Sequence, residues 1–291
     1  MSGQDGRHAG AMPVTRRRLL RLGLAILPGL LGAKLLSRWM PGLGEDAALG
    51  TSDLPPAGAL PPGPQGGPAG HDWAFVCDTT RCVGCGLCVE ACKLENHVPL
   101  DPEYNRTWVE RHVVTDDGSV FIDSPEGGIH GFPAQSTAPG ATGRAVRQSF
   151  FVPRLCMHCE NPPCVVVCPV SATYRTEDGV VLVDADRCIG CGYCLVACPY
   201  GGRYLVPSGG QTPAGTPGVA DKCTWCYHRI SRGQSPACVE VCPMGARAFG
   251  DLNDPESRVS IALQEQRTQV LRPALGTKPR VYYLGLEAEV E

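Results

Sequence analysis

The chain has 291 residues, of which 17 are cysteine, 36 glycine and 27 proline. This length allows one or two domains with a substantial core. The sequence has no 20-residue apolar run, which excludes a multi-span membrane protein. The formal charge of 26 − 29 = −3 gives no overall electrostatic case for nucleic-acid binding. Residues 1–40 nevertheless hold seven Lys or Arg residues against one acid, so the rest of the chain carries 19 − 28 = −9.

The N-terminal region has the pattern of an export signal. The segment T-R-R-R-L-L-R at 15–21 precedes an uncharged apolar run at 22–33. A basic segment before an apolar run of roughly 7–15 residues is typical of a signal peptide, and such a run is too short to span a bilayer. The pair Arg16 and Arg17 resembles a twin-arginine signal. We therefore interpret residues 1–40 as a twin-arginine signal region, with an amphipathic anchor or a chance arginine cluster as alternatives.

The segment that follows is rich in glycine and proline. In residues 41–70, 15 of 30 residues are Gly or Pro, which predicts a flexible linker over 41–71. No small-x-small cleavage site lies just after the apolar run, and the one at 57–59 is distant, so an uncleaved signal acting as a tether is an alternative. Folded structure is expected to start near Asp72.

Four groups of four cysteines account for sixteen of the 17 cysteines and leave only Cys77 outside them. The first and third groups have the spacing C-x-x-C-x-x-C-x-x-x-C, and the fourth separates its two pairs by 11 residues. The groups are Cys82, Cys85, Cys88 and Cys92; Cys156, Cys159, Cys164 and Cys168; Cys188, Cys191, Cys194 and Cys198; and Cys223, Cys226, Cys238 and Cys242. A proline follows the last cysteine of every group except the first.

This spacing is typical of iron–sulfur ligation. In a C-x-x-C-x-x-C loop, three thiolates take three iron corners of one cubane, and the fourth cysteine, often followed by proline, binds the other cluster of a two-cluster module. Glycine lets the loop backbone approach the sulfides and turn its N–H groups toward them. Such glycines are Gly84, Gly86, Gly190 and Gly192. The sequence therefore predicts [4Fe–4S] clusters.

Three other uses of the cysteines are alternatives. Cys₄ zinc sites are built from paired C-x-x-C units, whereas two of the groups place three cysteines within seven residues. A disulfide framework would suit an exported chain, but C-x-x-C-x-x-C crowds the thiols too closely for independent bridges. Redox-active C-x-x-C pairs would need a βαβ context that the sequence does not indicate.

With all four groups in view, the chain resembles, from about Asp72 to Leu284, the four-cluster ferredoxin-like iron–sulfur subunits of molybdopterin oxidoreductases. That family includes the subunits of polysulfide, tetrathionate and dimethyl sulfoxide reductases and of systems linked to nitrite reduction. The further motifs that carry the resemblance are C-K-L-E-N-H-V-P at 92–99, E-N-P-P-C at 160–164, E-D-G-V-V-L-V-D at 177–184, F-G-D-L-N-D-P at 249–255 and P-R-V-Y-Y-L at 279–284.

The resemblance implies an electron-transfer subunit with four [4Fe–4S] clusters and no catalytic residues of its own. Its implied partners are a molybdopterin-containing catalytic subunit and an integral-membrane quinone-binding subunit, with no nucleic acid. The chain would be peripheral to the membrane and periplasmic. It would reach that compartment folded and cofactor-loaded by the twin-arginine route, which fits the N-terminal pattern.

The resemblance also implies which cysteines share a cluster. The implied sets are Cys82, Cys85, Cys88 and Cys242 for cluster 1; Cys92, Cys223, Cys226 and Cys238 for cluster 2; Cys156, Cys159, Cys164 and Cys198 for cluster 3; and Cys168, Cys188, Cys191 and Cys194 for cluster 4. No cysteine is missing, so four complete [4Fe–4S] centres are expected. Lys93 stands where the other groups have proline, which makes Cys92 the least certain ligand from spacing alone.

The expected fold class is α+β, with two ferredoxin-like dicluster modules and long irregular loops. Short β-rich runs at 73–77, 149–152 and 180–183 flank the cysteine groups. Because the first and fourth groups share clusters, as do the second and third, the second module is inserted within the first. The domain would span 72–291, with an outer module at 72–123 and 219–255 and an inner module at 149–206.

The remaining segments give further expectations. The Gly-, Pro- and Ser-rich stretches 124–143 and 207–218 are predicted as surface loops, and 257–267 as an outer helix. Cys77 is predicted as a buried free thiol, and His158 and Trp225 as plain loop residues rather than cluster-tuning ones. Two other functions stay open, namely a catalytic or redox-sensing iron–sulfur protein and a freely diffusing polyferredoxin.

Overall fold

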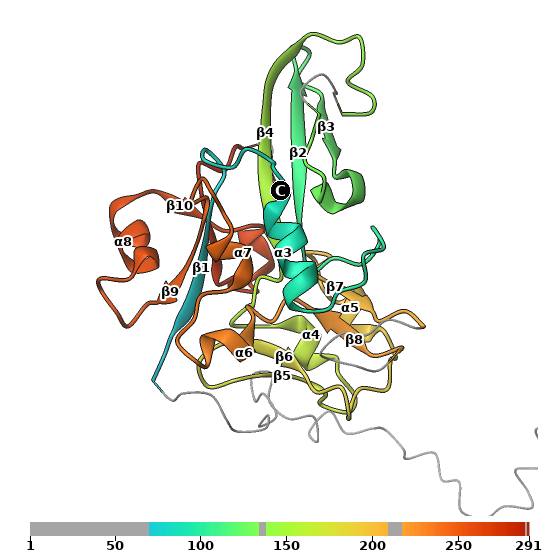
Figure 1. The fold of residues 1–291 in the computed structure, drawn as a ribbon, viewed down its shortest axis with the longest axis vertical. Coiled ribbons are helices and arrows are strands. Elements are labelled where there is room, and N and C mark those ends of the chain that lie inside the picture. Colours follow the sequence, from blue (N-terminus) through green and yellow to red (C-terminus); the bar gives the residue numbers. More distant parts are fainter. Residues whose placement is uncertain (1–69, 134–137, 209–216, 289, 291) are drawn as a thin grey trace, which may run out of the picture. The chain divides into compact units, whose positions relative to one another are not determined.

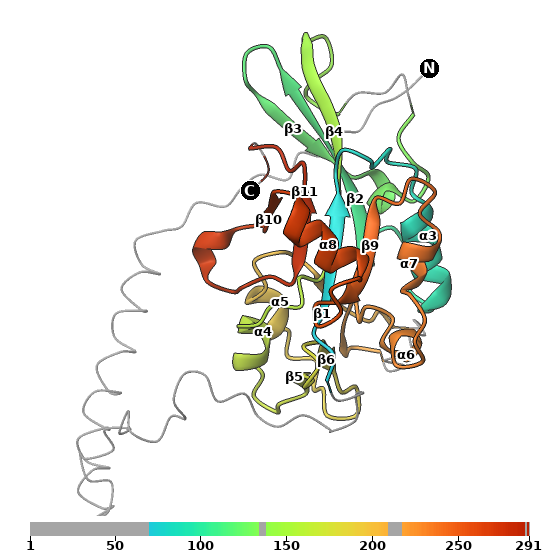
Figure 2. The same ribbon diagram turned by 90° about the vertical axis from the view of Figure 1, so that its left-hand side faces the viewer.

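The computed structural model describes residues 70–133, 138–208, 217–288 and 290 (Figure 1, Figure 2). The predicted signal region 1–40 and nearly all of the linker 41–71 lie outside the described residues. Short helices and four separate small sheets make this part an α+β structure. None of its described helices combines the length and apolar character that crossing a membrane requires.

The largest sheet has four strands, and strand β1 lies inside it (Figure 2). In spatial order the strands are β10 (Thr268–Gln269), β11 (Val281–Leu284), β1 (Trp73–Asp78) and β9 (Arg247–Asp251). Strand β1 runs parallel to β11 and antiparallel to β9, so Phe75 lies opposite both Val281 and Phe249. This strand confirms the one predicted at 73–77, and its pairing joins segments from the two ends of the described chain.

Alternate side chains of β1 pack on opposite faces of this sheet, as the two-residue period of a strand requires. Ala74 and Val76 pack in one cluster with Val259 of helix α8 (Arg258–Glu265). Phe75 and Cys77 belong instead to the large core that contains the cysteine groups. Helix α8 confirms the predicted outer helix, and its first turn is capped by the Ser257 hydroxyl. The sheet therefore separates α8 from the cysteine core.

A second sheet projects from the cysteine core at the top of Figure 1. Its order is β3 (Val120–Asp123), β2 (Thr107–Thr115) and β4 (Val146–Leu155), all antiparallel. Strand β4 contains the strand predicted at 149–152.

The prediction of a surface loop at 124–143 is wrong for part of that segment. It contains the 3₁₀ turn η1 (Pro125–Gly128), and Ala138 and Ala141 are buried against Val113. The carbonyl oxygens of Gly128 and Ile129 also lie against the turn at Gly86. Small residues allow this close packing. A composition rich in small residues also predicts a loop, so the sequence alone did not reveal the packing.

Two short hairpins connect the later cysteine groups. Strands β5 (Thr173–Arg175) and β6 (Val181–Val183) pair between the second and third groups, and β6 confirms the strand predicted at 180–183. Strands β7 (Arg203–Leu205) and β8 (Ala220–Lys222) pair between the third and fourth groups. Residues 209–216 of the predicted loop 207–218 lie outside the described residues.

Short helices accompany the cysteine groups. They are α3 (Leu87–Glu95), α4 (Pro163–Val166), α5 (Tyr193–Val196), α6 (Tyr227–Ile230) and α7 (Ala237–Glu240). A 3₁₀ turn, η2 (Pro273–Leu275), lies near the C-terminus. Helix α3 packs against α7, and α4 packs against α5. The first group is thus brought to the fourth, and the second to the third.

A buried ion pair fixes the start of β2 to β8. The Arg106 guanidinium donates to both carboxylate oxygens of Asp221, with Nε–Oδ2 2.8 Å and Nη2–Oδ1 2.7 Å. The Tyr204 hydroxyl also donates to this carboxylate, and Arg106 Nη1 donates to the Asn96 side-chain oxygen over 3.0 Å. The network connects a strand of the projecting sheet with the hairpin that leads to the fourth cysteine group.

Replacing Arg106 by methionine is expected to lower the free energy of unfolding by about 3–5 kcal/mol, because Asp221 would remain buried without its partner. The matched control is Arg144→Met, which removes the exposed Arg144–Asp117 pair and is expected to cost about 0–1 kcal/mol. Anaerobic urea unfolding followed by circular dichroism measures both. Equal losses in the two variants would contradict a structural role for the buried pair.

Candidate metal centres

Each cysteine group contains a C-x-x-C turn whose third residue has a left-handed backbone. These residues are Gly84 (φ 66°), His158 (φ 42°), Gly190 (φ 69°) and Trp225 (φ 53°). The conformation favours glycine, and a Cβ at Gly190 would lie 2.3 Å from the Gly218 carbonyl oxygen. The two glycines follow from the sequence pattern. The structure adds that His158 and Trp225 adopt the same turn, so all four groups begin with one local geometry.

The helix after the first group differs because Lys93 replaces proline. Helix α3 has nine residues and continues past Cys92, whereas α4, α5 and α7 have four residues each. Those three helices end before Pro169, Pro199 and Pro243, and proline cannot continue a helix because it has no N–H to donate. The buried Lys93 ammonium donates to the carbonyl oxygens of Pro99, Asp101 and Tyr104. Lys93 therefore stabilises the turn after Cys92.

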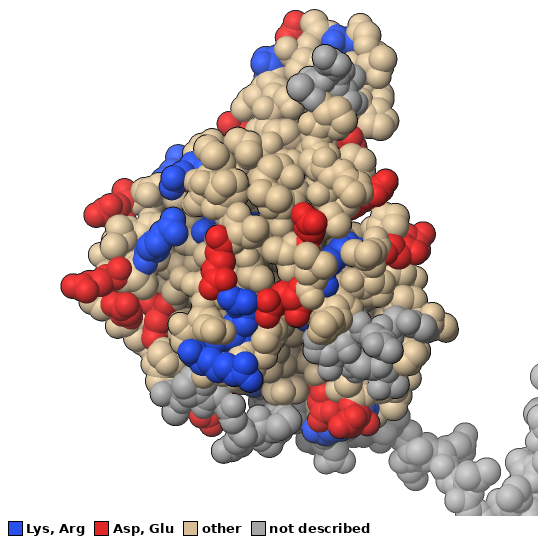
Figure 3. All heavy atoms as spheres, in the orientation of Figure 1, with Lys and Arg blue, Asp and Glu red and all other residues tan. Residues whose placement is uncertain are grey.

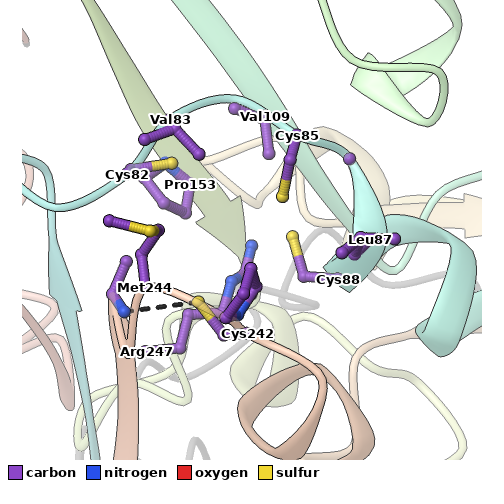
Figure 4. A pocket seen from close by; sticks show the side chains of 13 residues that line it. Cys82, Val83, Cys85, Leu87, Cys88, Val109, Pro153, Cys242, Met244 and Arg247 are labelled. Atoms are coloured by element: carbon purple, nitrogen blue, oxygen red, sulfur yellow. Dashed lines mark hydrogen bonds between the residues drawn. The ribbon is translucent and has the colours of Figure 1, made fainter.

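Four cysteines from the two ends of the described chain line one cavity (Figure 4). They are Cys82, Cys85, Cys88 and Cys242, and their sulfur atoms point into the shared space. The cavity opens to solvent. A cubane needs sulfurs spread around one space in this way, because each cysteine binds a different iron. In the described part of the chain, no three His, Cys, Asp or Glu side chains converge enough to hold a single metal ion.

The second set gathers around Asn96. The Asn96 side-chain nitrogen lies 3.6 Å from the sulfurs of both Cys92 and Cys226, which come from the first and fourth groups. Cys92 also interacts electrostatically with Cys223 and Cys238. All four of these cysteines are buried. The geometry thus brings Cys92 to the fourth group, although the missing proline made it the least certain ligand.

The third and fourth sets come from the second and third groups. Cys159 interacts electrostatically with Cys156, Cys164 and Cys198. For the remaining four cysteines, the contact is between the elements that carry them. Cys168 follows α4, Cys194 lies on α5, and these two helices pack together. The structure therefore places the cysteines of the first set around one cavity and those of the second and third sets within electrostatic range of one another, and it packs together the helices that carry the fourth set.

Backbone N–H groups donate to several cysteine sulfurs. The bonds are Ala246 to Cys242 (3.3 Å, dashed in Figure 4), Ala172 to Cys168 (3.2 Å), Ala220 to Cys188 (3.4 Å) and Trp225 to Cys223 (3.4 Å). In the second and fourth groups the donor follows the last cysteine by four residues, so the contact is part of the repeat. Such donors stabilise thiolate charge and help to set cluster potentials.

Burial makes seven of the sixteen thiols poor acids in the absence of iron. It raises the pKa of Cys82 to about 11 and the pKa values of Cys159 and Cys223 to about 12. Cys168 shows the opposite shift, because N–H donors at Thr173, Val170 and Ala172 outweigh its burial and lower its pKa. Iron must therefore displace protons from buried sulfurs, and this couples cluster binding to folding. The donor set fits [4Fe–4S] clusters, in which these cysteines would be iron-bound thiolates.

His158 and Trp225 are more than plain loop residues, contrary to the expectation. Both are fully buried, and their rings stack with centroids 4.0 Å apart. His158 Nδ1 accepts from the Val181 N–H over 3.0 Å, so its Nε2 carries the proton and donates to the Cys223 carbonyl oxygen. Burial and the nearby Lys222 hold the pKa of His158 well below its usual value. A neutral imidazole thus connects the second and fourth cysteine groups.

Cys77 is a buried thiol, as expected. It lies on β1 with no exposed surface, and burial raises its pKa to about 12. Its neighbours include Arg247 and the first cysteine set.

Exposure differs systematically among the four sets. Cys85 and Cys191 are the exposed members of the sixteen cysteines, and they belong to the first and fourth sets. The second set is entirely buried, and three of the four cysteines of the third set are buried. The first and fourth sets are therefore the most exposed, the second is enclosed, and the third is enclosed except at Cys198.

Comparisons with known proteins agree with this geometry. Two family profiles, each described as a 4Fe-4S dicluster domain, match residues 81–172 and 147–252. One subunit of tetrathionate reductase from Salmonella typhimurium is 41% identical over 219 residues, covering 75% of this chain and 74% of its own length. One subunit of sulfite dehydrogenase from Allochromatium vinosum is 42% identical over 72% of this chain and 82% of its own length. One polypeptide of polysulfide reductase from Wolinella succinogenes is 37% identical over 72% of this chain and 92% of its own length.

The similarity to these relatives covers most of their own length as well as most of this chain, and the two profiles together contain all four cysteine groups. Sixteen cysteines in four sets, with two dicluster matches, correspond to four [4Fe–4S] clusters. The chain therefore belongs to the four-cluster, ferredoxin-like iron–sulfur subunits of the molybdopterin oxidoreductase family.

Proposed function

We propose that this chain relays single electrons through a row of four [4Fe–4S] clusters between a membrane quinone-reactive subunit and a molybdopterin catalytic subunit. The observation that carries the proposal is the exposure of the cysteine sets, because the two exposed cysteines among the sixteen, Cys85 and Cys191, belong to the first and fourth sets. In a row of redox centres, electrons enter and leave at the two ends, so the end centres must be accessible and the centres between them can be enclosed. Clusters 1 to 4 take the cysteine sets in the order given above.

The proposed cluster order follows from which sets lie near one another. Cys238 of cluster 2 interacts electrostatically with Cys88 of cluster 1, and Cys223 of cluster 2 interacts with Cys156 of cluster 3. Clusters 3 and 4 are connected by the packing of α4 against α5. The row therefore runs 1–2–3–4, and the two exposed cysteines lie at its two ends.

We propose that the two modules are nested. The outer module, 72–123 with 219–255, would hold clusters 1 and 2, and the inner module, 149–206, would hold clusters 3 and 4. Pairing of β1 with β9 and packing of α3 on α7 support the outer module. The β5–β6 hairpin and the α4–α5 contact support the inner one. The projecting sheet β2–β3–β4 lies in sequence across the junction of the two.

The two ends of the row are rimmed by exposed apolar side chains, which suit docking to protein partners. Val83, Leu87 and Met244 are exposed at the cavity of cluster 1. Beside cluster 4, Ile189, Tyr193 and Val196 are exposed, and Val196 retains 90% of its surface. Acidic and basic side chains are interspersed on the face seen in Figure 3. We propose that one apolar rim binds the catalytic subunit and the other the membrane subunit.

The N-terminal region supports export of the folded chain. We propose that Arg16 and Arg17 belong to a twin-arginine signal and that the protein acts on the periplasmic face of the membrane. Clusters built before export would survive this route because the protein crosses already folded.

A freely diffusing polyferredoxin or a redox-sensing protein is the competing function. A sensing site would need an iron with a missing or exchangeable ligand, and the sixteen cysteines provide four ligands for each of four clusters. A diffusing carrier would purify without partners, whereas the proposed subunit is expected to co-purify with two other polypeptides from the membrane fraction.

The cluster assignments predict that cysteines far apart in sequence disturb the same centre. Cys82→Ser and Cys242→Ser are each expected to alter the electron paramagnetic resonance (EPR) signal of cluster 1, and Cys92→Ser and Cys226→Ser that of cluster 2. Redox-poised EPR spectra of the anaerobically purified variants make this comparison. Different centres affected by Cys82→Ser and Cys242→Ser would rule out the assignment of cluster 1.

The apolar rims predict two separable docking sites. Val196→Glu is expected to remove one partner from the purified complex, and Leu87→Glu the other, with turnover of the complex falling at least tenfold in each case. Ile261→Glu on α8, which lies across the large sheet from the cysteine core, is the control and should leave both partners bound. Iron content is measured in parallel. Loss of the same partner in both rim variants would contradict the two-ended arrangement.

The export proposal predicts that Arg16→Lys with Arg17→Lys retains the protein in the cytoplasm with its clusters assembled. Cell fractionation with immunoblotting locates the chain, and iron content of the retained protein shows that it has folded. Unchanged export of the double variant would refute a twin-arginine signal.

A further inference from the structure

Three cationic side chains are buried inside the cysteine core. Arg247 and Lys222 each retain 1% of their surface and Arg203 retains 8%. Among the described residues, none of the three forms an ion pair with a carboxylate, in contrast to the buried Arg106, which pairs with Asp221. A buried charge is costly unless something of opposite charge compensates it. The neighbouring cysteines are the groups that could supply this opposite charge.

Two of the cations occupy the same place in the cysteine repeat. Arg203 follows Cys198 by five residues, and Arg247 follows Cys242 by five, each within C-P-x-G-x-R. Arg203 begins β7 and Arg247 begins β9. Each also donates to a threonine hydroxyl: Arg203 to Thr173 over 3.2 Å and Arg247 to Thr107 over 3.0 Å. The repeat therefore places an arginine at equivalent positions in the inner and outer modules.

Arg247 lies between the first and second cysteine sets. It lines the cavity of the first set together with Cys82 and Cys88 (Figure 4). Electrostatic interactions join it both to Cys88 and to Cys238 of the second set. Its Nη1 atom is buried and has no hydrogen-bond partner in the described protein. This guanidinium therefore has a free donor in the region where the two clusters would approach each other.

Arg203 lies between the third and fourth sets. Its Nη2 donates to the Cys164 sulfur over 3.1 Å, and it interacts electrostatically with Cys156 and Cys198 of the same set. It also interacts with Cys194, which belongs to the fourth set.

Lys222 lies at the remaining boundary, between the second and third sets. Its ammonium donates to the carbonyl oxygens of Val181 and Cys223, the latter over 2.7 Å. It interacts electrostatically with Cys223 of the second set and with Cys156 and Cys164 of the third. The two carbonyl bonds hold the ammonium in place between the two sets.

We propose that Arg247, Lys222 and Arg203 are fixed counter-charges, one at each boundary between successive clusters, which raise the reduction potentials of both clusters they separate. The inference rests on the cluster assignments proposed above. Each transfer step oxidises one cluster and reduces its neighbour by one electron, with no bond formed and no proton required. The added electron is a negative charge in a low-dielectric core, so a cation nearby stabilises the reduced cluster. A cation at a boundary stabilises the added electron on either side, so it raises the potentials of both neighbouring clusters.

The test is to remove each charge and titrate all four clusters. Arg247→Met is expected to lower the potentials of clusters 1 and 2, Lys222→Met those of clusters 2 and 3, and Arg203→Met those of clusters 3 and 4. At a fixed solution potential the reduced-to-oxidised ratio of each affected cluster should fall at least tenfold, which corresponds to about 59 mV for one electron. EPR-monitored redox titration of the purified full chain measures these ratios.

Three controls separate charge from packing. Arg247→Lys and Arg203→Lys keep the positive charge, so the reduction potentials of the adjacent clusters should stay close to those of the unmodified protein. Arg280→Met removes an equally buried arginine that pairs with Asp72 and should leave all four potentials unchanged. If a methionine variant does not assemble four clusters, Arg247→Gln or Arg203→Gln replaces it. Unchanged potentials in the neutral variants, or a shift confined to one cluster of each pair, would overturn the proposal.

Failure of this inference can be told apart from failure of the proposed function. If the arginine and lysine variants hold four clusters with unshifted potentials, the proposed electron-transfer function is unaffected and only the role of the counter-charges is refuted. If the cysteine variants contradict the assignments, the boundaries themselves are wrong. In that case a shift would appear in clusters that are not neighbours in the row.

Discussion

The burial of cysteine sulfur in a core of short strands and helices is the constraint on which the rest of the structure depends. Burial raises the pKa values of thiols such as Cys82, Cys159 and Cys223, so the core without iron would enclose protonated sulfurs around open cavities. Iron replaces those protons and fills the space, which links cluster insertion to folding. The same low-dielectric surroundings strengthen the interaction of each sulfur with nearby N–H groups and fixed charges.

Much of the site could be predicted from the sequence because most ligands of a cluster lie within a short segment of the chain. Three cysteines within seven residues, with glycines between them, define a loop with little freedom, and the structure places Gly84 and Gly190 in the required left-handed conformation. Strand β1, strand β6 and helix α8 follow from equally local patterns of apolar residues. The partnership of Cys242 with the first group is not local. It was implied by family resemblance, and the shared cavity supports it.

What sequence reasoning missed depends on contacts between segments far apart in the chain. His158 and Trp225 look like ordinary loop residues until the fold stacks them between the second and fourth groups. Alignment of the four C-x-x-C turns would have marked both, since each stands where the other turns have glycine. The two C-P-x-G-x-R motifs are visible in the sequence. Their burial beside two cysteine sets appears only once β7 and β9 are in place.

The central claim is that sixteen cysteines hold four cubanes in one chain. Iron and acid-labile sulfide, measured per chain on anaerobically purified protein, test it most directly. The account predicts about sixteen of each, four for every cluster. About four zinc ions per chain with no sulfide would contradict it, and so would an iron content near half of that expected in protein with all its cysteines intact.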